Sequence, residues 1–264
     1  MKNLMVLFWL LISIIVAEAQ KISATDLAAI SKDINLVIID ARSSADYLKT
    51  HVNGAINLDV ELLSDKTPIE GVLKDKATVT KILGEHGITL SSKIVVYCKT
   101  GVRAGRLYWI LKYMGCSDVK MLDGQMDGWF SARKPITKVA KTPKAATFTA
   151  SVKNNLLVNK AYVQSKLKDT KTVIVDSRKK VDYDAGHIGD AVNIPSESML
   201  IGTKIKSNSE LETIFKNAGV TKDKEIILYC KTSTTAGLEF FILTSLLNYT
   251  NVKVYDGAYL EWSK

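Results

Sequence analysis

The chain has 264 residues, of which 47% are hydrophobic and 24% charged, a size and composition typical of about two globular domains. Its net charge of +9 comes from lysines scattered along the chain. The sequence lacks a basic run interleaved with aromatic residues, which argues against a nucleic-acid partner, and the positive excess favours small anionic substrates instead.

The first 19 residues have the pattern of a secretory signal peptide. A short positive start at residues 1–3 precedes an apolar run at 4–16 and a small-x-small cleavage site at 17–19. The run is shorter than the roughly 20 residues of a membrane span, and no cysteine follows it for lipid attachment. We expect an exported protein, periplasmic or secreted, that starts at Gln20 and has no stable membrane insertion after cleavage. A retained N-terminal anchor is the alternative.

The rest of the first half alternates apolar runs, typical of parallel strands buried on both faces, with segments of helical periodicity. We expect strands at 36–40, 93–97 and 119–122, and a short strand after a turn within 51–58. We expect helices at 21–31 (capped by Ser23 or Thr25), 44–50, 78–86 and 103–114, and a helical segment after the turn at 123–129. The apolar positions of 103–114 predict one buried face, and Gly115 is placed to end this helix.

The second half repeats this order. Asp40 and Asp176 are separated by 136 residues, and Cys98 and Cys230 by 132. A repeat of that length indicates duplicated domains, because solenoid repeats run to about 20–50 residues. The predicted fold class is therefore α/β, with two tandem domains, each a parallel sheet flanked by helices. We place domain 1 at 20–132, a proline- and lysine-containing linker at 133–150, and domain 2 at 151–264.

Each half contains one Tyr-Cys-Lys-Thr segment, with the cysteine at 98 or 230, directly after a β-branched or aliphatic run. A cysteine between a strand end and a helix start faces unpaired backbone amides and the positive end of the helix dipole. This environment favours thiolate over thiol and creates a nucleophile. It equally favours an anion held beside the sulfur. The alternative is that each cysteine is only a small buried residue of the core.

The third cysteine, Cys116, is expected to be a small buried residue. An odd number of cysteines leaves at least one free thiol, and one cysteine in each repeat argues against a disulfide between Cys98 and Cys230. The three histidines are far apart in the sequence and have no metal-ligand spacing with the cysteines, so we expect no metal and no other cofactor.

In order, these landmarks resemble the tandem rhodanese family, the group of thiosulfate and 3-mercaptopyruvate sulfurtransferases. The resemblance is carried by Asp-x-Arg, a following Tyr, a segment ending in Ala-x-Asn, the Tyr-Cys loop and Asp-Gly before a Trp, each present twice. It implies that a cysteine persulfide passes a sulfane sulfur from a small anionic donor to a thiophilic acceptor. The catalytic candidates are Cys98 and Cys230, and the substrate-binding candidates are Lys99, Thr100, Gly101, Val102, Arg103, Lys231, Thr232, Ser233, Thr234 and Thr235.

Loop length argues against a phosphatase of related fold, whose loop would read Cys-x5-Arg. Cys98 and Arg103 give Cys-x4-Arg, and a shorter loop suits a sulfur atom. Gly101 can adopt the positive φ that a tight cradle requires. At the matching position of the second loop Ser233 departs from the family's glycine, which predicts a reshaped loop and a cost of about 1 kcal/mol if φ is positive.

The donor is suggested by charge. Tandem enzymes often carry an arginine just before the tyrosine of domain 2, and here that position is Asp182. This argues against mercaptopyruvate, whereas Lys99 or Lys231 could attract thiosulfate or a similar inorganic donor. A non-catalytic binding or sulfur-carrier protein is the alternative function. The remaining landmarks are expected to be structural: Asp40 with Arg42 and Asp176 with Arg178 as ion pairs, His51 and His187 near turns, and Trp129 and Trp262 in the core.

Overall fold

Two five-stranded parallel sheets, one in each half of the chain, organise the computed structural model, which describes residues 20–264. The predicted signal peptide lies outside the described residues. The first sheet has the order β1 (Lys21–Ile22), β6 (Val119–Leu122), β5 (Lys93–Tyr97), β2 (Leu36–Asp40), β4 (Ile56–Asn57). The second has the matching order β8 (Leu157–Val158), β14 (Val252–Tyr255), β13 (Glu225–Tyr229), β9 (Thr172–Asp176), β10 (Val192–Asn193). The predicted α/β duplication is confirmed.

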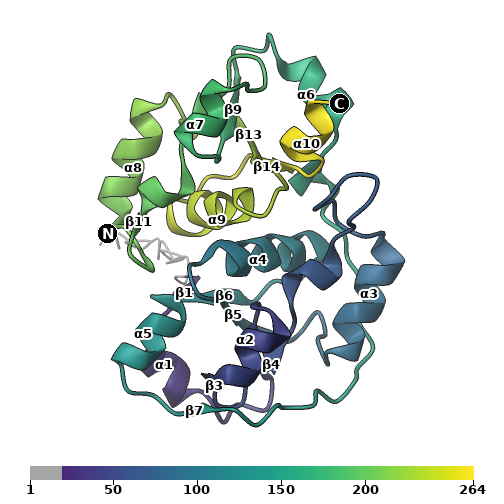
Figure 1. The fold of residues 1–264 in the computed structure, drawn as a ribbon, viewed down its shortest axis with the longest axis vertical. Helices are drawn as coiled ribbons and strands as arrows, with labels where there is room; N and C mark the ends of the chain where they lie inside the picture. Colours follow the sequence, from purple (N-terminus) through teal and green to yellow (C-terminus); the bar gives the residue numbers. More distant parts are fainter. Residues whose placement is uncertain (1–19) are drawn as a thin grey trace, which may run out of the picture.

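Helices cover both faces of each sheet (Figure 1). In the first half they are α1 (Ala24–Ala29), α2 (Ser44–Lys49), α3 (Lys76–Glu85), α4 (Val102–Met114) and α5 (Gln125–Ser131). In the second half they are α6 (Lys160–Lys166), α7 (Lys180–Asp184), α8 (Asn208–Asn217), α9 (Ala236–Phe241) and α10 (Ala258–Trp262). Two small antiparallel pairs complete the fold: β3 (His51–Val52) with β7 (Ile136–Thr137), and β11 (Leu200–Ile201) with β12 (Lys204–Ile205). No helix in residues 20–264 is long and apolar enough to cross a membrane.

The start of the first domain corrects the prediction of a helix over 21–31. Lys21 and Ile22 form a strand instead, because Ile22 is buried and the pair lies parallel to Met121 and Leu122 at the sheet edge. The helix begins only after Ser23, whose hydroxyl accepts a hydrogen bond from the Asp26 amide at 3.0 Å. A helix N-cap therefore follows directly on an edge strand.

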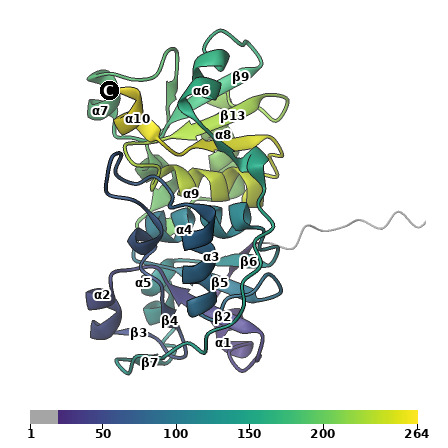
Figure 2. The same ribbon diagram turned by 90° about the vertical axis from the view of Figure 1, so that its right-hand side faces the viewer.

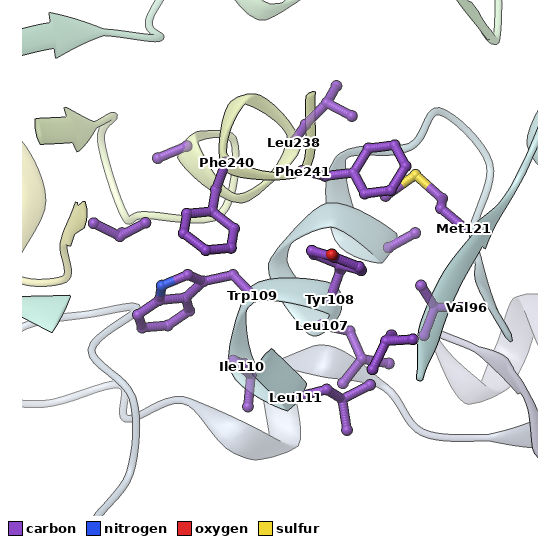
Figure 3. Close-up of a cluster of buried hydrophobic side chains, with 14 of the residues drawn as sticks. Val96, Leu107, Tyr108, Trp109, Ile110, Leu111, Met121, Leu238, Phe240 and Phe241 are labelled. Atoms are coloured by element: carbon purple, nitrogen blue, oxygen red, sulfur yellow. The ribbon is translucent and has the colours of Figure 1, made fainter. Parts of the chain in front are cut away.

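Helices α4 and α9 lie side by side between the two sheets (Figures 1 and 2). The prediction of one buried face on α4 is incomplete, because side chains all around this helix are buried, including Arg106, Tyr108 and Trp109. Two glycines, Gly105 on α4 and Gly237 on α9, allow the close approach. A β-carbon at Gly105 would lie 2.5 Å from the Leu238 nitrogen. Aromatic side chains fill the space beside this contact, with the Tyr108 ring edge-on to Phe241 at 4.9 Å (Figure 3).

The segment predicted as a linker is attached to domain 1. Its Lys141 amide donates to the Tyr47 hydroxyl at 3.0 Å, and its Ala146 amide donates to the Gly84 carbonyl at 2.9 Å. Phe148 is buried in the core. Residues 133–150 therefore run along the first domain in a fixed path, in contrast to a freely solvated tether.

Each domain sends one segment across to the other, and the segment from domain 1 meets the Cys230 loop. In domain 1, the loop before α3 reaches domain 2 at Gly71. A β-carbon at Gly71 would lie 2.5 Å from the Thr232 carbonyl oxygen. The β11–β12 hairpin of domain 2 reaches back, and the Thr203 hydroxyl donates to the Gly124 carbonyl at 3.2 Å. The two cysteine loops therefore lie near the boundary between the domains.

Candidate active site

The Asp-x-Arg motifs form internal ion pairs, as predicted. The Arg42 Nε lies 2.9 Å from one Asp40 carboxylate oxygen, and the Tyr97 hydroxyl donates to the other at 2.8 Å. Asn57 then bridges the motif by donating to the carbonyl oxygens of Asp40 and Arg42. The same bonds recur in domain 2 among Asp176, Arg178, Tyr229 and Asn193. The motifs fix the carboxyl ends of the central strands, where the cysteines follow.

The histidines and tryptophans also have structural surroundings. His51 is buried, and one ring nitrogen lies 2.7 Å from the Tyr47 carbonyl oxygen. His187 lies 3.1 Å from the Tyr183 carbonyl oxygen and stacks on the same tyrosine. Trp129 is buried, whereas Trp262 is partly buried against the outer cluster of domain 2. The core prediction holds fully for Trp129 only.

The Cys98 loop forms the predicted amide cradle. Gly101 has φ of +91°, and its amide donates to the Cys98 Sγ at 3.1 Å. The Cys98 amide donates to the Gln125 side chain at 2.9 Å, a contact that the sequence analysis missed. Burial raises the pKa of the Cys98 thiol, and the surrounding loop amides lower it, with burial the larger effect. The net environment therefore favours the thiol over the thiolate.

The cationic side chain of this loop is already paired. Arg103 lies 2.9 Å from Asp59 and also contacts the Glu61 carboxylate. Lys99 and Thr100 are exposed, and Val102 is partly buried. The guanidinium that could have held an anionic donor near Cys98 is neutralised by two acidic side chains.

The Cys230 loop has a different shape, as Ser233 predicted. Ser233 has φ of +60°, and its hydroxyl donates to the Tyr255 carbonyl oxygen at 2.7 Å. The helix that follows begins at Ala236, whereas α4 begins at Val102, two positions earlier in the repeat. Within residues 20–264 no backbone amide donates to the Cys230 Sγ. The side chain of Ser233 fixes a strained turn that glycine would adopt more freely.

Cys230 opens onto a cavity of about 200 Å³. Arg178 at its wall is committed to Asp176. Lys179 and Lys231 form no ion pair within the described residues, so their ammonium groups are available at the cavity wall. Two acidic residues also line it, and the full lining is Ser177, Arg178, Lys179, Asp182, Ser196, Glu197, Cys230, Lys231 and Thr235.

The structure separates the predicted residues of this loop. Lys231 and Thr235 share the cavity with Cys230, whereas Thr232 and Thr234 line a different cavity of about 130 Å³ between the domains. Ser233 is buried beneath the loop. The sequence analysis missed most of the remaining wall, because those residues come from segments distant in the sequence.

Cys98, Cys116 and Cys230 are all free, which confirms the prediction of no disulfide between the two loops. Cys116 is buried in the core, and burial raises the pKa of its thiol to about 12. Within residues 20–264 no group of three or more His, Cys, Asp and Glu side chains is arranged to hold a metal ion.

Comparisons with known proteins give matches over both halves of the chain. The model of the rhodanese-like domain matches residues 23–132 and 159–264. The chain is 29% identical to 3-mercaptopyruvate sulfurtransferase from Escherichia coli, over 87% of this chain and 90% of the relative. It is 30% identical to thiosulfate sulfurtransferase from Bos taurus, over 82% and 78%. The crystal structure of SseA from Escherichia coli superposes with a TM-score of 0.85 at 28% identity, covering 91% and 98%.

Proposed function

The chain belongs to the rhodanese family, and on that premise we propose that it moves a sulfane sulfur from a small anionic donor, through a persulfide on Cys230, to a thiophilic acceptor. We choose Cys230 over Cys98 because of the cavity. Cys230 lines a space of about 200 Å³ together with Lys231, which has no ion-pair partner among the described residues. Cys98 has the better amide cradle, but its loop arginine is neutralised by Asp59 and Glu61.

The reaction has two steps that balance without a cofactor. In the first, the Cys230 thiolate attacks the outer sulfur of the donor, the donor's sulfur–sulfur bond breaks, and its electron pair leaves with the remaining fragment, which is sulfite when thiosulfate is the donor. In the second, the acceptor attacks the outer sulfur of the persulfide, and the Cys230 thiolate is restored. Positive charge beside the sulfur stabilises the anionic persulfide in both steps.

The donor we favour is thiosulfate or another inorganic sulfane compound. Lys179 and Lys231 offer ammonium groups to a compact dianion. Asp182 lines the same cavity at the position where tandem enzymes often carry an arginine, so no guanidinium from this position can pair with the carboxylate of mercaptopyruvate. Relatives with each activity are similar to this chain, so mercaptopyruvate is the second choice.

We further propose that the protein acts after export, in the periplasm or outside the cell. The support is the order of charged start, apolar run and small-x-small site in residues 1–19. Detection of an N-terminus at Gln20 in the exported fraction would support this assignment, and a protein that keeps residues 1–19 inside the cell would contradict it.

The activity is tested by thiocyanate formation from thiosulfate and cyanide with the unmutated protein, Cys98→Ser and Cys230→Ser. We expect Cys230→Ser to abolish turnover and Cys98→Ser to keep most of it. Loss of turnover in Cys98→Ser alone would move the site to domain 1. An unmutated protein inert with both thiosulfate and mercaptopyruvate would favour the non-catalytic binding or carrier protein.

A further inference from the structure

The two domains differ at a pair of buried positions behind the cysteine loops. Domain 1 has Ala41 directly after β2 and Leu107 on α4. The equivalent positions of domain 2 are Ser177 and Glu239. Both apolar residues are thus replaced by polar ones in the domain whose cysteine opens onto the cavity.

Glu239 is fully buried, with 0% of its surface exposed, and Ser177 is 1% exposed. Within the described residues neither carboxyl oxygen of Glu239 nor the Ser177 hydroxyl has a hydrogen-bond partner of good geometry. A buried polar group without a partner destabilises the folded protein, so this pair needs an explanation. The position of Ser177 suggests an explanation, because this residue lines the same cavity as Cys230.

The surroundings of Glu239 favour its neutral form, because the carboxyl group is fully buried. Burial raises the pKa of Glu239 well above its ordinary value; the nearby Ser177 hydroxyl lowers it, and the charge of Asp176 raises it. The other ionisable groups named here near α9 form ion pairs or hydrogen bonds of their own, or line the cavity wall. Arg178 and Tyr229 bind Asp176, Arg106 of α4 pairs with Asp256, and Glu197 lines the cavity wall.

A neutral carboxyl group fixes the direction of a serine hydroxyl beside it. The acid O–H donates to the serine oxygen, so the serine's own hydrogen must point to another acceptor. An ionised carboxylate would do the opposite, because it has only acceptors and would take the serine's hydrogen. In domain 2, Ser177 and Cys230 line the same cavity, so the sulfur of Cys230 or of its persulfide is an acceptor within this cavity.

We propose that Glu239 is a positioning residue that turns the Ser177 hydroxyl toward the sulfur on Cys230, where this hydroxyl donates a hydrogen bond to the thiolate and the persulfide. The inference rests on the proposed function for its catalytic meaning, but the hydrogen bond itself is independent of turnover. Domain 1 has Ala41 and Leu107 at these positions, so it has neither the hydroxyl nor the carboxyl group.

The test uses Ser177→Ala, Glu239→Leu and Glu239→Gln, with peptide-resolved mass spectrometry of iodoacetamide labelling against pH. A lost donor destabilises the Cys230 thiolate, so Ser177→Ala and Glu239→Leu should slow its labelling near neutral pH by about three- to tenfold. Glu239→Gln should label like the unmutated protein, because an amide N–H can also donate to Ser177. Labelling of Cys98 in the same samples is the control and should not change.

Turnover gives the second readout. In the unmutated protein kcat/KM should fall as pH rises through the raised pKa of Glu239, and in Glu239→Gln this fall should disappear. Ser177→Ala with Glu239→Leu should be no worse than Ser177→Ala alone, because both act through one hydroxyl. Unchanged Cys230 labelling in Ser177→Ala and Glu239→Leu, with superimposable pH profiles for Glu239→Gln, would overturn the inference while the sulfurtransferase activity stands. An unmutated protein without turnover would instead refute the proposed function.

Discussion

Charged side chains around Cys230 decide which small molecules can reach the sulfur. Lys179 and Lys231 lie in the cavity without ion-pair partners among the described residues, while Asp182 and Glu197 line other parts of its wall. Around Cys98 the loop arginine, Arg103, is held by Asp59 and Glu61, and Lys99, the equivalent of Lys231, is exposed. The second loop therefore keeps Lys231 in one cavity with the sulfur, whereas the arginine of the first loop is paired with two carboxylates.

Replacing Lys231 by alanine should weaken donor binding. Loss of one partly solvated charge contact is worth on the order of 1 kcal/mol, which corresponds to about a fivefold rise in the KM for thiosulfate. Lys231→Arg keeps the charge and should stay near the unmutated value, and Lys99→Ala in the other loop should have little effect. Steady-state kinetics check this, and a larger effect of Lys99→Ala would contradict the assignment to domain 2.

Glu239→Gln should also change how stability depends on pH. Glutamate ionises near pH 4.3 in the unfolded chain, whereas burial raises the pKa of Glu239 in the folded chain well above this value. Folding therefore takes up a proton above about pH 4.3, and the unmutated protein loses stability relative to Glu239→Gln as pH rises toward the folded pKa.

This stability difference should grow by up to about 1.4 kcal/mol per pH unit in that window. Urea unfolding of both proteins at about pH 5 and about pH 7 measures it. A difference that does not change with pH would mean that Glu239 is already ionised in the folded protein.

The helices α4 and α9 form the element that joins the two halves. A β-carbon at Gly105 would meet the Leu238 nitrogen at 2.5 Å, and one at Gly237 would meet the Arg106 Cα at 2.6 Å. Backbone therefore packs directly on backbone, which no residue with a side chain allows. Each cysteine loop leads into one of these helices, so their separation also sets the distance between the loops.

Gly105→Ala should destabilise the protein by about 1–3 kcal/mol, because the added methyl group forces the helices apart. The sign of this change in the free energy of unfolding is diagnostic, because alanine normally stabilises a helix interior by about 1 kcal/mol relative to glycine. Gly237→Ala should behave in the same way. Chemical unfolding tests both variants, and a stabilised Gly105→Ala would show that the two helices are not in close contact.

At the scale of the whole molecule, the two domains share one core. A continuous apolar cluster includes residues of both halves, among them Trp109 and Phe240. Arg106 of domain 1 lies 2.7 Å from Asp256 of domain 2, and both side chains are buried. The Tyr108 and Ser245 hydroxyls lie 2.7 Å apart across the same boundary. These contacts predict that the domains unfold together.

Arg106→Met should cost about 3–5 kcal/mol, because it leaves the Asp256 carboxylate buried without its partner. Arg106→Met combined with Asp256→Asn should recover part of this loss, since no unpaired charge remains. Unfolding followed by tryptophan fluorescence and by circular dichroism should give coincident transitions in the unmutated protein. Two separate transitions would contradict the shared core.

Local pattern predicted much of this structure. The apolar runs ending at Asp40 and Tyr97 form the expected central strands, and the Asp-x-Arg motifs form the expected ion pairs. The edge strand at Lys21 and Ile22 was missed because two residues have no periodicity, and their conformation depends on pairing with β6, about 100 residues away. The full burial of α4 was missed for the same reason, since α9 covers its second face.

The site could be predicted as two cysteine loops but not as a cavity. Ser233 signalled a reshaped second loop, but the sequence did not indicate that Thr232 and Thr234 would line a different cavity from Cys230. Glu239 was missed because a single acidic residue in a helix usually faces water. Its alignment with Leu107 in the other repeat was the available signal, because equivalent positions of duplicated domains have equivalent burial.

The most direct test of the central claim is the location of the persulfide. The protein is treated with thiosulfate without an acceptor, and peptide mass spectrometry then measures the gain of one sulfur atom at each cysteine. The account predicts this gain on Cys230, its loss as thiocyanate when cyanide is added, and no such cycle on Cys98. A persulfide that forms and discharges on Cys98, with Cys230 unchanged, would contradict it.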